Sequence, residues 1–169
     1  YRATIDDPRI AEVRILRPQE IPVYVANGLF DVGIAGRDWI EETGSDVTSL
    51  GELKYSKVTA KPVKIVVAVP ADSAYESIKD LPQGVRVSSE YPELTKRHFA
   101  EAGVEADVQL SYGATEAKAP EIVDAVVDLT ETGSALKAAG LKIIDEILTS
   151  YTEIFANNDS YQDPDKRKA

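Results

Sequence analysis

Short β-branched runs alternate along the chain with segments of helical periodicity. Between residues 12 and 42 the pattern predicts strand, helix, strand and helix. The first helix is predicted because Ile21, Val25 and Leu29 repeat at a spacing of four. Further runs predict strands at residues 47–53, 63–69, 85–89, 106–110, 125–129, 141–148 and 152–156, and helices at residues 92–102, 116–122 and 135–139. This alternation favours an α/β sheet with ligand sites beyond the C-terminal ends of its strands.

Residues 124–140 contain the most informative stretch. Ala125–Leu129 is a short apolar run typical of a parallel strand covered on both faces, with Asp128 near its C-terminal end. Thr130–Ser134 is small and hydroxylated apart from Glu131, and Ala135–Ala139 has good helix propensity. We therefore expect a strand, a tight turn and a helix.

Such a turn is suited to hold a phosphate group. The first N–H groups of a helix lack partners and its dipole is positive there, while Thr132 or Ser134 adds a hydroxyl. Gly133 permits positive φ and close approach of the backbone, and Asp128 can reach a ribose hydroxyl or a magnesium ion. The alternative is a simple helix cap, which the turn alone favours. The neighbouring carboxylate favours a phosphorylated sugar.

Composition narrows the classes of function. The chain has 169 residues, 43% of them apolar, with no cysteine, a single histidine and a net charge of −10. Disulfides, thiol catalysis and multi-histidine metal sites are excluded. Excess acid opposes binding of nucleic acid, and we expect any nucleotide to arrive with Mg²⁺. Without a long apolar run or a leader, we expect a cytoplasmic protein and no membrane.

The residues around the turn resemble a known family. The sequences EAKAP at residues 116–120 and DAVVDLTETGSAL at residues 124–136 are similar to the signature of ATP phosphoribosyltransferase, the first enzyme of histidine biosynthesis. In that family the turn holds the 5′-phosphate of phosphoribosyl pyrophosphate. The family usually has threonine where this chain has Ala135, so one hydroxyl donor is lost.

The resemblance covers nearly the whole chain and implies its fold. We expect two α/β lobes like those of type II periplasmic binding proteins, with a cleft between them. The first lobe would comprise residues 1–62 and 150–169, and the second residues 63–149. Val63–Val69 and Thr152–Ala156 are expected as neighbouring crossover strands. We also expect the family's first strand before Tyr1, a further region after Ala169, a long-form type of chain and a homo-oligomer at full length.

The resemblance also implies the reaction and its residues. The expected reaction transfers ribose 5-phosphate from phosphoribosyl pyrophosphate to N1 of ATP, and a chain lacking both ends is expected to be weakly active or inactive. The implied residues for phosphoribosyl pyrophosphate are Asp128, Thr130, Glu131, Thr132, Gly133, Ser134 and Ala135. Those for ATP are Arg17, Asp38, Trp39, Tyr91 and Glu116, with Arg17 and Asp128 catalytic and no residue assigned to a metal.

Structural interpretations of several of these residues stay open. Asp38 and Glu116 are also typical acids of a first helical turn, and Trp39 is typical of a partly buried aromatic. Tyr91 suits a base-stacking residue or a surface cap equally. We interpret His98 as a surface residue and the lysines 54, 57, 61 and 64 as a solvated face.

Two other classes remain as alternatives. A solute-binding module would share the two-lobed fold without catalysis. The other class is a phosphoribosyltransferase of the other common fold, which usually has two adjacent acids before its turn. Here Leu129 follows Asp128, which argues against that class.

Overall fold

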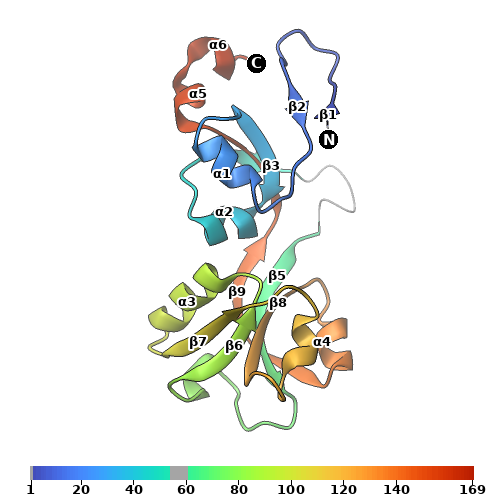
Figure 1. Ribbon diagram of the computed structural model, residues 1–169, viewed down its shortest axis with the longest axis vertical. Coiled ribbons are helices and arrows are strands. Elements are labelled where there is room, and N and C mark those ends of the chain that lie inside the picture. The colour runs from blue at the N-terminus through green and yellow to red at the C-terminus, as the bar shows by residue number, and fades with distance from the viewer. Residues whose placement is uncertain (1, 54–60) are drawn as a thin grey trace. The chain divides into compact units, whose positions relative to one another are not determined.

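The computed structural model describes residues 2–53 and 61–169. It divides into two compact units, Tyr1–Ala60 with Tyr151–Ala169, and Lys61–Ser150 (Figure 1). Lys54 and Lys57 of the predicted basic face lie outside the described residues, whereas Lys61 and Lys64 are exposed.

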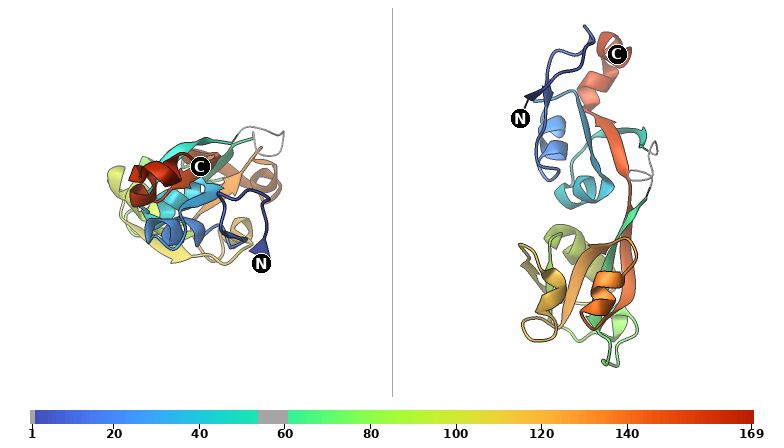
Figure 2. Two further views of the ribbon diagram at one scale, coloured as in Figure 1. Left: turned by 90° about the horizontal axis from the view of Figure 1, so that it is seen from above. Right: turned by 90° about the vertical axis from the view of Figure 1, so that its right-hand side faces the viewer.

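The first unit is built on a three-stranded antiparallel sheet in the order β3-β10-β4. The elements of this unit are β1 (Arg2–Ala3), β2 (Val13–Arg14), α1 (Ile21–Ala26), β3 (Val32–Gly36), α2 (Arg37–Thr43), β4 (Thr48–Glu52), β10 (Thr152–Ala156), α5 (Asn158–Gln162) and α6 (Pro164–Arg167). Helices α1 and α2 lie on one face of the sheet (Figures 1 and 2), where Val25, Ile40 and Phe155 form the core. A Cβ on Gly33 would lie 2.7 Å from the Ile21 side chain, so only glycine allows α1 to pack this closely on β3.

The second unit has a five-stranded mixed sheet in the order β7-β6-β8-β5-β9. Its strands are β5 (Val63–Pro70), β6 (Val85–Ser89), β7 (Ala106–Leu110), β8 (Ala125–Thr130) and β9 (Leu141–Ser150). Strand β6 is parallel to β7 and β8, whereas β5 is antiparallel to β8 and β9. Its helices are α3 (Pro92–Glu101) and α4 (Ser134–Ala138), with the short 3₁₀ segments η1 (Ile78–Asp80) and η2 (Thr115–Lys118).

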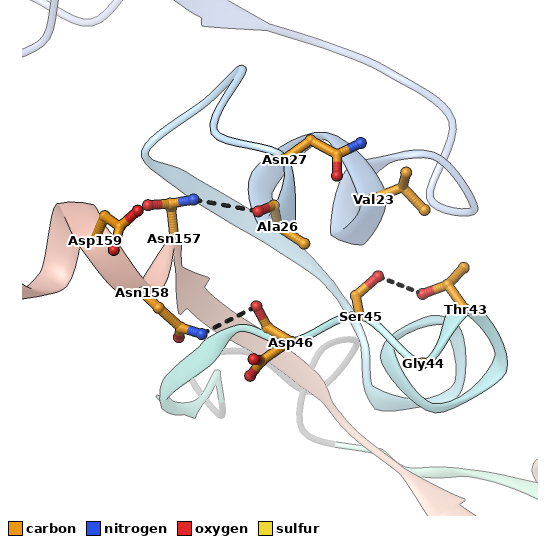
Figure 3. A pocket seen from close by; sticks show the side chains of 10 residues that line it. All are labelled: Val23, Ala26, Asn27, Thr43, Gly44, Ser45, Asp46, Asn157, Asn158 and Asp159. Atoms are coloured by element: carbon orange, nitrogen blue, oxygen red, sulfur yellow. Dashed lines mark hydrogen bonds between the residues drawn. The ribbon is translucent and has the colours of Figure 1, made fainter.

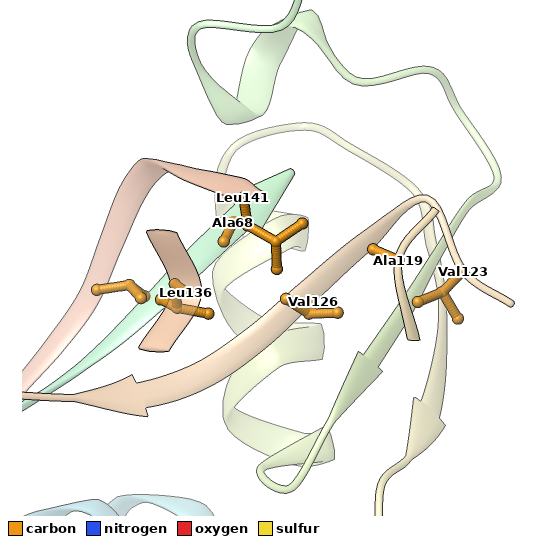
Figure 4. Close-up of a cluster of buried hydrophobic side chains, with 7 residues drawn as sticks. Ala68, Ala119, Val123, Val126, Leu136 and Leu141 are labelled. Atoms are coloured by element: carbon orange, nitrogen blue, oxygen red, sulfur yellow. The ribbon is translucent and has the colours of Figure 1, made fainter. Parts of the chain in front are cut away.

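Helices α3 and α4 cover opposite faces of this sheet. Leu136 of α4 packs in one apolar cluster with Val66 and Val126 (Figure 4). On the other face, Thr95 of α3 donates from Oγ1 to Ser89 Oγ at 2.8 Å, and Ser89 is the register partner of Val127. Because side chains alternate along a strand, Asp128 lies on the same face as Val126 and α4.

Two expectations about strands need correction. Strand β8 is parallel to β6 alone, and Leu129 is 42% exposed, so the strand is not covered along its whole length. Val63–Val69 and Thr152–Ala156 are not neighbours, because β5 pairs with β8 and β9 while β10 pairs with β3 and β4. The place beside β5 that was expected for residues 152–156 is taken by the ten residues of β9. Tyr151 separates β9 from β10.

His98 is also not the surface residue expected from its charged neighbours. Its side chain is 23% exposed, and its Nε2 atom lies 2.6 Å from Asp145 Oδ2 on β9. Asp145 is the register partner of Val67, which places this pair on the sheet face that carries α3. The interaction therefore joins α3 to the edge strand of the sheet.

Candidate functional site

The turn after β8 is closed by its own side chains. Gly133 has φ +80°, and its N–H donates to Thr130 Oγ1 at 2.7 Å. The hydroxyl groups of Thr132 and Ser134 are hydrogen-bonded to each other. The glycine is thus needed for the left-handed conformation, as the sequence predicts. Helix α4 is only five residues long, so its dipole contributes little, and recognition of an anion depends on the hydroxyl and N–H groups of the turn.

An open pocket of about 440 Å³ lies against this turn. It is lined by Thr132, Gly133, Ser134, Lys137 and Ala138. Lys137 is a residue that the sequence interpretation missed, although its position three residues after Ser134 in a helix indicates that both side chains share one face. It adds a positive charge beside the hydroxyl groups. The pocket therefore combines donors and a cation, which is the chemistry that a phosphate monoester requires.

Asp128 is half-buried beside the turn. Burial is the main cause that raises its pKa to about 6, and the charges of Glu116 and Glu90 raise it further. A hydrogen bond from the Leu129 N–H group to Asp128 Oδ1, 2.8 Å long, lowers this pKa in part. The carboxylate is ionised at neutral pH, but it is held in an environment that favours a hydrogen-bond donor or a cation.

Three carboxylates lie where parallel strands of the sheet end. Glu90 directly follows β6, Glu116 lies in η2 after β7, and Asp128 is near the end of β8. The pairing of Ser89 with Val127 brings Glu90 level with Asp128. Glu90 was missed from the sequence, although its position directly after a strand was the available signal. The structure thus brings together Asp128, Glu116 and the turn in the second unit.

These carboxylates do not form a metal site of the protein's own. Within residues 2–53 and 61–169, no group of three or more acidic or histidine side chains is arranged to hold a metal ion. Mg²⁺ is commonly held by one or two carboxylates together with substrate phosphates, an arrangement that needs no such group.

The remaining predicted residues of the second unit have different surroundings. Glu131 and Ala135 are exposed on either side of the turn. Tyr91 is only 1% exposed and belongs to the core, so neither a base-stacking side chain nor a surface cap describes it. Its position after a strand end suggested a site residue, whereas the structure buries its side chain, and its N–H donates to Ser89 Oγ at 2.9 Å.

The predicted nucleotide residues Arg17, Asp38 and Trp39 belong to the first unit. Arg17 is exposed, and its carbonyl accepts a hydrogen bond from the Glu20 N–H group before α1. Asp38 lies in the first turn of α2 and is 6% exposed, and Trp39 is partly buried. These burials match the structural interpretation of both residues, and their role in binding stays a prediction.

A second pocket, of about 500 Å³, lies in the first unit (Figure 3). Its polar lining includes Thr43, Ser45, Asp46, Asn157 and Asn158. Asn158 Nδ2 donates to the Asp46 carbonyl at 3.2 Å, and Asn157 Nδ2 donates to the Val25 carbonyl at 2.9 Å. None of the residues predicted to bind a substrate lines this pocket.

The structure defines an α/β protein with the fold of type II periplasmic binding proteins and a hydroxyl-rich glycine turn between β8 and α4. An amino-acid ABC transporter's substrate-binding protein superposes with a TM-score of 0.56 at 17% identity, covering 92% of this chain and 70% of that one, which supports the fold. Among the described residues, each helix is too short or too polar to cross a bilayer.

The chain belongs to the ATP phosphoribosyltransferase family, whose model matches residues 17–169. It is 48% identical to the ATP phosphoribosyltransferase of Nitratidesulfovibrio vulgaris strain DP4 over 99% of this chain and 57% of that protein. It is 45% identical to that of Chlorobium chlorochromatii, over 99% and 56%. A Thermotoga maritima ATP phosphoribosyl transferase (HisG:HisZ) complex gives a TM-score of 0.79 at 26% identity, covering 91% of this chain and 71% of that one. The chain therefore spans somewhat more than half the length of these curated relatives.

Proposed function

We propose that this chain belongs to the catalytic region of an enzyme that transfers ribose 5-phosphate from phosphoribosyl pyrophosphate to N1 of ATP. The observation that carries the proposal is the turn at residues 130–135 beside Asp128, in a chain that matches the family model over residues 17–169. Similarity to solute-binding proteins supports the fold alone, because those proteins share only about 17% of the sequence.

The turn is proposed to bind the 5′-phosphate. Apart from its two chain neighbours, the described part of the chain brings a single atom, Cδ1 of Ile143 at 3.5 Å, within 4 Å of the position that a Cβ of Gly133 would occupy, so an anion can approach the backbone closely. The hydroxyl groups of Thr132 and Ser134 are then free to exchange their mutual hydrogen bond for bonds to phosphate oxygens. Lys137 adds charge from the adjacent turn of α4.

Asp128 is proposed to accept hydrogen bonds from the ribose hydroxyl groups. Its environment penalises the ionised form, because it is half-buried and faces Glu116 and Glu90. Two hydroxyl donors compensate that penalty, so binding of the sugar and ionisation of Asp128 support each other.

The chemical step forms a bond between N1 of ATP and C1 of the ribose while the bond from C1 to pyrophosphate breaks. The transition state resembles an oxocarbenium ion, so catalysis depends on positioning and on neutralising the leaving group. We assign Arg17 to the leaving pyrophosphate, and Asp38, Trp39 and Glu116 to the nucleotide. Tyr91 is omitted because it is buried. Mg²⁺ is proposed to enter with the pyrophosphate, since the described carboxylates form no site for it.

The longer protein is proposed to be a cytoplasmic homo-oligomer. Its substrates, ATP and phosphoribosyl pyrophosphate, are cytoplasmic metabolites. The Thermotoga maritima relative is a complex, which supports assembly but not its composition here.

Calorimetric titration tests the class of ligand. We expect this chain, which spans 57% of its relative, to bind phosphoribosyl pyrophosphate with Mg²⁺ weakly and to release pyrophosphate from ATP mixtures slowly or not at all. Glucose and arginine serve as ligands typical of solute-binding proteins and should give no heat. Tight binding of either solute, with none of phosphoribosyl pyrophosphate, would contradict the proposal.

A further inference from the structure

A buried hydrogen-bond network follows strand β7. Ser111 Oγ is 2.7 Å from Thr115 Oγ1, and Lys118 Nζ donates to Ser111 Oγ at 2.6 Å. Ser111 is 4% exposed and Thr115 is 2% exposed. The N–H of Ser111 also donates to the Ser89 carbonyl at 2.8 Å, which fixes the serine against the end of β6. A lysine bound to so rigid an acceptor is held in one place.

This network forms hydrogen bonds with both ends of η2. Thr115 and Lys118 are the first and last residues of η2, and Glu116 lies between them. Immediately after η2, Ala119 and Val123 join the apolar cluster of Val126 (Figure 4). The backbone position of η2, which carries Glu116, is therefore fixed by the hydrogen bonds of Thr115 and Lys118 with Ser111 and by this apolar packing.

We propose that Lys118 is a positioning residue that, by binding Ser111, holds η2, and with it Glu116, beside strand β8, which carries Asp128. The effect on substrate rests on the proposed function, whereas the geometric effect on Asp128 does not. Lys118 itself lies on Ser111 and acts on the ligand only through Glu116.

The charged groups around Asp128 make this role measurable. The charge of Glu116, in η2, and the charge of Glu90, directly after β6, both raise the pKa of Asp128. On β5, Val66 is its register partner, and Lys64 lies opposite Thr130 and pairs with Glu146 at 3.5 Å. Since Glu116 raises the pKa of Asp128, release of Glu116 should lower it.

The test is carboxyl ¹³C NMR of Asp128 in the ligand-free chain, followed by calorimetry with phosphoribosyl pyrophosphate and Mg²⁺. In Lys118→Met the titration of Asp128 should move to lower pH, and affinity at pH 7.5 should fall about tenfold as one charged contact loosens. Ser111→Ala removes the acceptor instead of the donor and should produce the same shift. If Lys118→Met does not fold, Ser111→Ala alone tests the proposed positioning of Glu116.

Two variants serve as controls. Lys118→Arg keeps a donor and should restore the titration and the affinity of the parent. Lys79→Met removes an exposed lysine of η1 and should change neither. Unchanged titration of Asp128 in both Lys118→Met and Ser111→Ala would overturn the proposed positioning. A shifted titration in a chain whose parent binds no phosphoribosyl pyrophosphate would confirm the positioning and contradict the proposed function.

Discussion

His98 Nε2 and Asp145 Oδ2 lie 2.6 Å apart and join helix α3 to the edge strand β9. Both side chains are partly shielded from solvent, with 23% and 31% exposed. The contact spans 47 positions in the sequence, so no local pattern could reveal it. It holds the outer strand of the second unit against the helix that covers this face of the sheet.

His98→Ala should lower the free energy of unfolding by about 1–2 kcal/mol, because Asp145 loses a partly buried partner. Urea denaturation measures the change. Lys96→Ala, on the exposed side of the same helix, should cost less than about 0.5 kcal/mol. Equal effects of the two substitutions would show that the contact does not stabilise the unit.

Asn157→Ala should destabilise the first unit by about 2 kcal/mol. The Asn157 side chain caps α5 by accepting from the Ser160 N–H group and also donates to the Val25 carbonyl at 2.9 Å. Asn157→Ser keeps an acceptor for the cap but not the reach to α1, so its loss should be intermediate. Thermal unfolding distinguishes the variants. A serine variant as stable as the parent would show that the bond to Val25 contributes nothing.

Asp128→Asn should stabilise the ligand-free chain at pH 7.5 by about 1–2 kcal/mol, allowing for partial exposure. The folded pKa of Asp128, about 6, lies above its ordinary value of 3.8. Its ionised form therefore destabilises the fold above pH 6, and this cost shrinks as the pH falls from 6 towards 4. The gain of the asparagine variant should shrink in parallel.

Urea denaturation across this pH range measures the stability of the asparagine variant. Calorimetry with phosphoribosyl pyrophosphate at pH 7.5 measures its binding. The variant should be more stable yet bind phosphoribosyl pyrophosphate poorly, because the carboxylate proposed to accept hydrogen bonds from the ribose hydroxyl groups is gone. Lower stability of the asparagine variant at pH 7.5 would contradict the environment described for Asp128.

Local signals in the sequence predicted much of the fold. The strand at residues 152–156 and the left-handed turn at Gly133 were predicted correctly, because alternation and glycine chemistry act over a few residues. The partner of β5 was not, because strand order depends on packing between distant segments. The same limit explains why Tyr91 was placed outside the core although it is buried.

The residues of the candidate site were likewise predicted where the signal is local and missed where it depends on distant segments. Asp128 and the turn at residues 130–135 were predicted from contiguous sequence, the structure places them side by side, and their role in binding stays a prediction. Glu90 and Lys137 were missed, because each becomes relevant only when β6 is placed beside β8 or when α4 is seen to line a pocket.

The turn at Gly133 is proposed to hold the phosphate of phosphoribosyl pyrophosphate. Calorimetry of Gly133→Val beside Gly103→Val tests this role, because Gly103 has a similar positive φ of +75° and open space around its Cβ position. Both variants carry backbone strain of about 1–2 kcal/mol, so the loss of stability should be alike. We predict that Gly133→Val loses detectable binding while Gly103→Val retains the affinity of the parent. Equal affinity of the two folded variants would show that the turn is only a helix cap.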